Sequence, residues 1–85
     1  MPSTTVTVGS AVGLHARPAA VIANAVNESG HDVTLSVDGG DPVDAGSALM
    51  IMTLGAEQGV AVTVESDDQA TVDAIAALVA QDLDA

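Results

Sequence analysis

The sequence contains no Phe, Tyr or Trp, and its hydrophobic residues, 48% of the total, are mostly Ala and Val. No aromatic ring is available to stack on nucleic-acid bases, and a formal net charge of −11 repels a phosphate backbone. The composition therefore argues against nucleic-acid binding. At 85 residues the chain has the length of one domain and can bury a modest core.

Cysteine is also absent, which excludes disulfides, thiolate zinc sites and a cysteine nucleophile, and is compatible with a reducing compartment. The apolar runs ALMIM and AIAALVA are too short to cross a bilayer. The opening segment MPSTTVTVGS has neither the basic nor the apolar region of a signal peptide. We therefore expect a soluble cytoplasmic protein that makes no contact with a membrane.

Lysine is absent as well, and a single arginine stands against twelve acidic residues. The acids are scattered rather than grouped as in a calcium-binding loop, and the strong apolar periodicity disfavours disorder. An acidic, lysine-free surface suits high salt, so a halophilic protein is expected. Residues 1–27 contain no Asp or Glu, which leaves the sequence around His15 without negative charge.

Apolar residues recur with a strand or helix period in seven segments. Alternation with a period of two predicts strands over 4–8, 31–37 and 60–66, with a short strand around Pro42 and Val43. Helical spacing predicts helices over 18–27, 47–54 and from Val72 to Leu83, with Asp73 in the first turn of the last one. Gly30 and Gly55 are expected to end the first two helices.

The order β-α-β-β-α-β-α predicts an α+β fold, a two-layer open-faced sandwich with its helices on one face of the sheet. A right-handed crossover leaves a gap between the first two strands that the fourth can fill, giving a four-stranded antiparallel sheet of order 1-4-2-3. Asp38-Gly39 predicts a type I′ hairpin turn, and Pro42 places its strand at an edge.

The decapeptide AVGLHARPAA at 11–20 brings His15 and the single arginine, Arg17, to the predicted start of a helix. Pro18 suits a first helical turn and biases Arg17 away from helical dihedrals. A helix N-terminus and a guanidinium both attract phosphate oxygens, so His15 is placed to accept a phosphoryl group. The spacing alone is also compatible with no functional role, in which His15 is a surface loop residue and Arg17 a solvated charge.

Residues 13–19, GLHARPA, resemble the active-site signature of HPr, the histidine-containing phosphocarrier family of the sugar phosphotransferase system. Residues 46–55, GSALMIMTLG, are similar to the second-helix motif of that family. The similarity extends to length and element order, so 1–85 is identified as a single HPr-like domain.

The resemblance implies that His15 takes a phosphoryl group on Nδ1 from phosphorylated Enzyme I, itself charged by phosphoenolpyruvate, and passes it to enzyme IIA domains for sugar uptake. It implies that Arg17 neutralises the phosphoryl group and that Ala16 and Pro18 form the helix start behind the site. Such a protein is a monomeric phosphocarrier with a phosphohistidine intermediate, needs no cofactor, and is not an enzyme acting on a free substrate.

The sequence departs from the family at the surface that faces partners, where relatives carry lysines and this chain has none. Apolar docking contacts are therefore expected from Ala16, Ala20, Leu49, Met50 and Ile51. Ser47 matches a serine that a dedicated kinase phosphorylates in some branches, although an N-cap role also explains it. His31 is expected to be an exposed loop residue, and no metal site is expected, because no further ligands have suitable spacing.

Two other functions are compatible with the sequence. An HPr-like regulatory module would use the phosphorylation state of His15 to control a transcription factor or a metabolic enzyme. A purely structural domain would tolerate the loss of His15. The sequence names neither the sugar nor the particular partners.

The acid excess predicts that salt stabilises the fold. Repulsion among the acids opposes compaction, and screening shortens its range from about 10 Å at 0.1 M salt to about 3 Å at 1 M. We expect the thermal unfolding midpoint, followed by circular dichroism, to rise from low to molar potassium chloride. A midpoint that is flat or falls would show that the acidity is incidental to stability.

Overall fold

A computed structural model describes residues 2–82 and confirms the predicted order of strands and helices. The elements are β1 (Ser3–Thr7), α1 (Ala16–Ser29), β2 (Val33–Val37), β3 (Val43–Asp44), α2 (Ala48–Thr53), β4 (Ala61–Ser66) and α3 (Gln69–Ala80). Leu83, predicted in the last helix, lies outside the described residues. Within the described part, no helix has the length and apolar character needed to cross a membrane.

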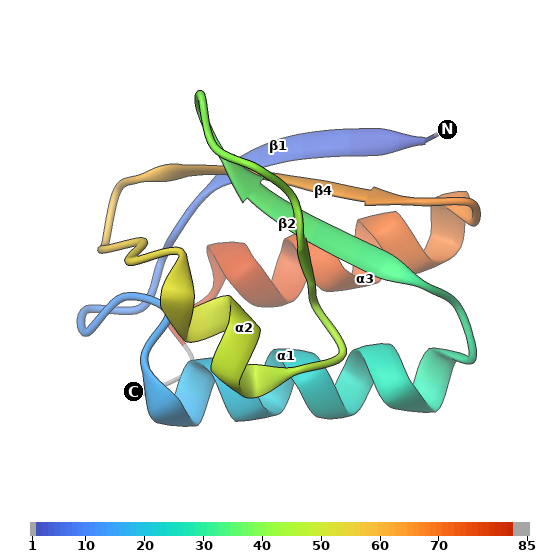
Figure 1. The fold of residues 1–85 in the computed structure, drawn as a ribbon, viewed down its shortest axis with the longest axis horizontal. Helices are drawn as coiled ribbons and strands as arrows, with labels where there is room; N and C mark the ends of the chain where they lie inside the picture. The colour runs from blue at the N-terminus through green and yellow to red at the C-terminus, as the bar shows by residue number, and fades with distance from the viewer. Residues whose placement is uncertain (1, 83–85) are drawn as a thin grey trace.

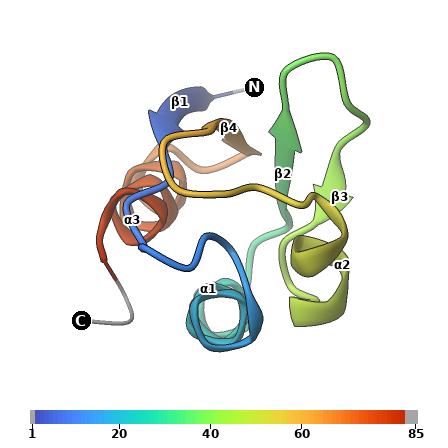
Figure 2. The ribbon, with the colours of Figure 1, turned by 90° about the vertical axis from the view of Figure 1, so that its left-hand side faces the viewer.

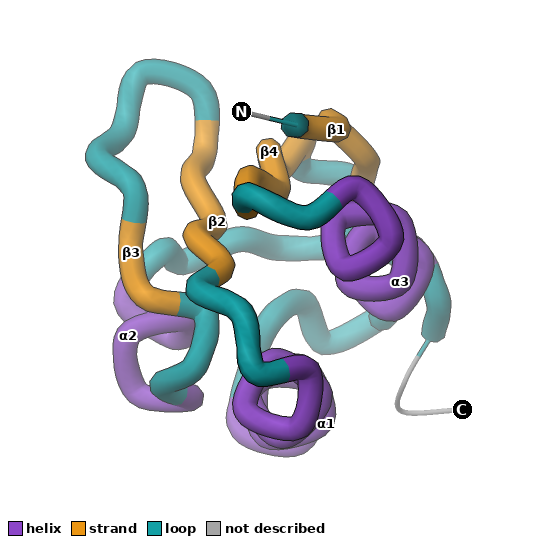
Figure 3. The backbone as a smooth tube through the Cα atoms, turned by 90° about the vertical axis from the view of Figure 1, so that its right-hand side faces the viewer, coloured by secondary structure: helices purple, strands orange, loops and turns teal. Residues whose placement is uncertain are grey.

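The four strands form one sheet of order β1-β4-β2-β3 with antiparallel neighbours throughout, which confirms the predicted topology. Figures 1 and 2 show the three helices gathered on one side of this sheet, and Figure 3 shows the same two layers from the opposite end. The edge position of β3 is as Pro42 required, because a proline directly before that strand cannot donate to a ladder.

The core lies between the sheet and the helices and is built from small aliphatic side chains. Leu35, Val62 and Val64 supply the sheet side, where Val64 pairs with Leu35 across β4 and β2. Ile22 of α1 and Ile75 of α3 are at most 2% exposed and pack from the helix layer. The other face of the sheet carries polar side chains, among them Thr5 and Thr63, whose hydroxyls lie 2.9 Å apart. One buried and one solvated face explain the period-two pattern.

The predicted type I′ turn at Asp38-Gly39 is wrong. Such a turn needs positive φ at both central residues, but only Gly39 has it, at 77°. The backbone N–H of Gly40 donates to the carbonyl of Val37 over 2.9 Å, which closes a turn with the φ signs of type II. Pairing with β3 begins only at Leu35 and Val43, so the loop is longer than a two-residue hairpin.

Two further boundaries differ from the expectation. Asp73 is not in the first turn of α3, because Asp68 caps the helix and lets it begin at Gln69. The Asp68 carboxylate accepts hydrogen bonds from the Thr71 backbone N–H at 3.0 Å and from its hydroxyl at 2.7 Å. Val60, expected on the buried face of the fourth strand, lies before β4 and is 36% exposed.

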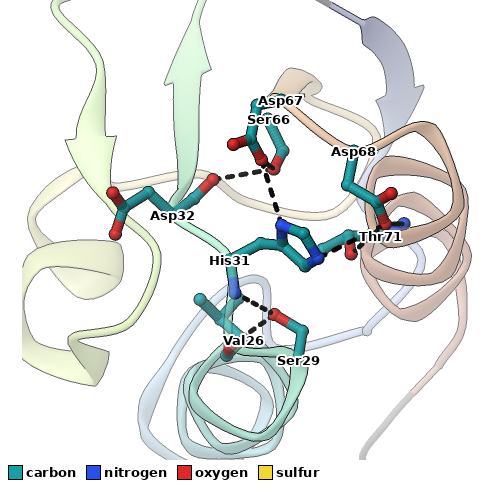
Figure 4. Close-up of polar contacts among 8 residues, drawn as sticks. All are labelled: Val26, Ser29, His31, Asp32, Ser66, Asp67, Asp68 and Thr71. Atoms are coloured by element: carbon teal, nitrogen blue, oxygen red, sulfur yellow. Dashed lines mark hydrogen bonds and ion pairs between the residues drawn. The ribbon is translucent and has the colours of Figure 1, made fainter.

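His31 was predicted to be an exposed loop residue, but its side chain contacts two acidic residues. Figure 4 shows its ring pointing from the α1–β2 connection toward the start of α3, with Nδ1 3.1 Å from Asp67 Oδ1 and Nε2 3.8 Å from Asp68 Oδ2. The Ser66 hydroxyl, also at this junction, donates to the Asp32 carbonyl over 2.7 Å. These contacts join the two connections that leave α1 and β4.

The Asp68 cap predicts acid-sensitive stability. The Thr71 hydroxyl and backbone N–H, with a smaller effect from His31, hold the pKa of Asp68 below its ordinary value. Its stabilisation is therefore present above the ordinary aspartate pKa of about 3.9 and is lost as the pH falls through the lower folded-state pKa. We expect Asp68→Ala to lower the unfolding midpoint at neutral pH, with the difference from wild type closing in acid.

Asp41→Ala is the matched control, since it removes one acid from an exposed loop residue. Equal midpoints for the two variants at neutral pH would show that the Asp68 cap does not stabilise the protein. Circular dichroism over the pH series provides the measurement.

Candidate functional site

His15 is the N-cap residue of α1, and its side chain is exposed. Its backbone is extended, with φ −88° and ψ −165°, and its carbonyl accepts the N–H of Ala19 over 2.8 Å. The imidazole makes no capping hydrogen bond. The first N–H groups of a helix point out of its end without an intrahelical acceptor, so the ring stands beside a group of anion-attracting donors.

Ala16, Arg17 and Pro18 form the first turn of α1, which starts earlier than the sequence predicted. Arg17 is helical and exposed, although the following proline was expected to bias it away from helical dihedrals. Pro18 is buried at the third helical position, where its missing N–H removes no intrahelical bond. The tolerance of a first turn for proline therefore outweighs the restriction on the preceding residue.

Gly13 allows the loop before His15 to approach the α2–β4 loop closely. Its φ is +74°, and a Cβ built on it would lie 2.5 Å from the Ala56 carbonyl oxygen and 2.9 Å from the Glu57 Cα. Leu14 donates its backbone N–H to the same Ala56 carbonyl over 2.9 Å. In Figure 1 the chain entering α1 accordingly lies beside the end of α2. A side chain at position 13 would separate the two loops.

This approach forms a pocket of about 180 Å³ beside the imidazole. It is lined by Val12, Leu14, His15, Met52, Gly55, Ala56 and Glu57. Apart from His15 and Glu57 the lining residues are apolar, and Arg17 is not among them. The sequence reasoning missed Glu57, because no local signal places residue 57 beside a histidine at position 15.

The short helix α2 lies against α1 and begins at the predicted N-cap. The Ser47 hydroxyl accepts the Met50 backbone N–H over 3.3 Å, which confirms the capping interpretation. Leu49 and Met50 are 69% and 40% exposed. Ile51, expected on the docking surface, is instead fully buried, so its place in that surface is corrected and it belongs to the core.

Further exposed apolar side chains lie near the histidine in sequence. Val12 is 50% exposed and Val21 is 37% exposed, and neither was singled out from the sequence. Ala16 and Ala20, which were singled out, are exposed on α1. Across residues 2–82, no cluster of three or more His, Cys, Asp and Glu side chains is arranged to hold a metal ion.

Comparisons with known proteins agree on one family. Residues 2–81 match the family model described as the PTS HPr component phosphorylation site. The chain is 40% identical over 82 residues to the Phosphocarrier protein HPr of Streptomyces coelicolor, an alignment covering 93% of this chain and 88% of the relative.

Solved structures give the same result. The phosphocarrier protein HPr from Bacillus anthracis str. Ames is similar with a TM-score of 0.82 and 33% identity, over 92% of this chain and 95% of that one. HPr-C-His from Thermoanaerobacter tengcongensis has a TM-score of 0.88 and 27% identity, over 100% of this chain and 98% of that one. With the family model spanning nearly all described residues, the chain belongs to the HPr family, the phosphocarrier proteins of the phosphotransferase system.

Proposed function

We propose that this chain accepts a phosphoryl group on His15 from phosphorylated Enzyme I, charged by phosphoenolpyruvate, and passes it to enzyme IIA components for sugar uptake. The observation that carries the proposal is the exposed imidazole of His15 at the N-cap of α1, which makes no capping hydrogen bond. Membership of the HPr family supports the same role. The protein acts in the cytoplasm as a single-domain monomer of residues 1–85.

The transfer chemistry needs a nucleophile and a place for negative charge. A lone pair on a His15 ring nitrogen, Nδ1 in this proposal, forms the new N–P bond. The group of Enzyme I that carried the phosphoryl keeps the electron pair of the bond that breaks. The backbone N–H groups of Ala16 and Arg17, at the start of α1 just before Pro18, and the guanidinium of Arg17 offset the charge on the phosphoryl oxygens.

Partners dock on an apolar surface in this proposal, which we define as Ala16, Ala20, Leu49 and Met50. All four residues are exposed, and the two helices that carry them, α1 and α2, pack against each other. The chain has no lysine, so contacts at this surface must be mainly apolar. A serine kinase acting on Ser47 would turn the hydroxyl that accepts the Met50 N–H into a phosphate ester and add negative charge beside this surface.

Loss of the imidazole should abolish phosphorylation. We expect wild type incubated with Enzyme I and phosphoenolpyruvate to gain one phosphoryl group, and His15→Ala to gain none, because the accepting nitrogen is gone. The added mass should persist in alkali and disappear in acid, as for a phosphoramidate. Mass spectrometry measures both.

His31→Ala is the matched control for the other histidine of the chain. It should retain the full added mass, with circular dichroism to verify folding after its contact with Asp67 is removed. Label that survives His15→Ala would refute the assignment of the accepting residue.

Replacement of Arg17 should slow transfer. Arg17→Ala removes the guanidinium that meets charge in the transition state, and we expect a loss of roughly tenfold to hundredfold in the transfer rate from Enzyme I. Arg17→Lys keeps the charge without the fork of donors and should be intermediate. Rapid-quench kinetics provide the rates, and an unchanged rate for Arg17→Ala would remove this residue from the site.

A further inference from the structure

Glu57 is an acidic residue that the fold brings to the wall of the pocket beside His15. His15 and Glu57 line the same pocket of about 180 Å³, and both residues are exposed. Their proximity is fixed by backbone contacts, because Leu14 donates to the Ala56 carbonyl over 2.9 Å and thereby joins the residue before His15 to the residue before Glu57. The acid is thus held beside the histidine by the fold.

Glu57 is the one acidic residue among those that line the pocket beside His15. The segment that carries the histidine has no acid from 1 to 27, and the other residues lining the pocket are apolar. A protein-bound phosphoryl group carries about −1.5 to −2 charge near pH 7, so phosphorylated His15 and the Glu57 carboxylate repel each other.

We propose that Glu57 sets how strongly His15 retains its phosphoryl group. Its repulsion disfavours the phosphorylated form relative to the free imidazole, which favours onward transfer, and the effect fades as salt screens it. Arg17 and the N-terminus of α1 act in the opposite sense. The proposal rests on phosphoryl transfer to His15 as proposed above and adds a residue that adjusts its equilibrium.

Potassium phosphoramidate is a suitable probe, because it phosphorylates without a protein partner and so separates the pocket from docking. A His15 ring nitrogen forms the N–P bond while the N–P bond of the donor breaks, and ammonia leaves with that electron pair. The fraction of phosphohistidine at equilibrium is measured by phosphorus NMR on the full chain. The series is run at about 0.1 M and about 2 M potassium chloride, where the Debye length is near 10 Å and below 3 Å.

Three variants isolate the charge. Glu57→Gln removes it with little change in shape, and Glu57→Asp keeps it. Glu65→Gln removes one acid on β4, far along the strand from the 56–60 loop, where Glu65 pairs with Ser3 and Thr34 in the sheet. This last variant corrects for the general effect of lowering the net charge.

At the lower salt, we expect Glu57→Gln to raise the phosphorylation equilibrium constant about threefold to tenfold. Glu57→Asp should stay near wild type, and Glu65→Gln should change the constant less than about twofold. At the higher salt the advantage of Glu57→Gln should fall below about twofold. A merely structural role for Glu57 would not produce this dependence on salt.

Equal constants for Glu57→Gln and Glu65→Gln at low salt would overturn the role of Glu57, as would an advantage that persists undiminished at high salt. If Enzyme I labels His15 of the wild type, the proposed function holds even when one of these two outcomes overturns the role of Glu57. Labelling by phosphoramidate without transfer from Enzyme I would overturn the proposed partner and still decide the role of Glu57. Wild type labelled by neither donor would overturn both proposals.

Discussion

The candidate site depends on one close backbone approach, between the loop that enters α1 and the loop that follows α2. Leu14 donates to the Ala56 carbonyl there, and Gly13 has no Cβ to keep the two backbones apart. Leu14 is also buried in the core, so the loop is held by apolar packing as well as by a hydrogen bond. Because His15 follows directly, the same approach fixes its place at the helix end and closes one side of its pocket.

The architecture was predictable because each element carries its own periodic signal. Alternation and helical spacing predicted the order of elements, and Pro42 together with crossover handedness predicted the order of strands. The errors lie in loops and at helix ends, where several backbone conformations are compatible with the same residues. Asp38 does not adopt the positive φ of a type I′ turn, so the loop before β3 is longer. Asp68 begins α3 early through its contacts with Thr71, a capping signal that the apolar pattern does not include.

The site was predictable to the extent that it is contiguous in sequence. His15, Arg17 and the helix start lie within a few residues, and the structure confirms that α1 begins there. Glu57 was not predictable, because only the pairing of two loops brings it to the pocket. Ile51 was misplaced because a helix of six residues is too short for its pattern to separate a buried face from an exposed one, and the core takes that side chain.

The charge distribution constrains how any phosphate group reaches this histidine. A net charge of −11 gives a repulsive field at a distance, so attraction must arise from groups close to the site. The N-terminus of α1 and Arg17 act only over the first turn or a few ångströms, and residues 1–27 add no opposing acid. In the proposed function, apolar contact at Ala16, Ala20, Leu49 and Met50 brings a partner within that range. In the same proposal, docking at this surface and charge stabilisation at the start of α1 therefore act together during transfer from a partner protein.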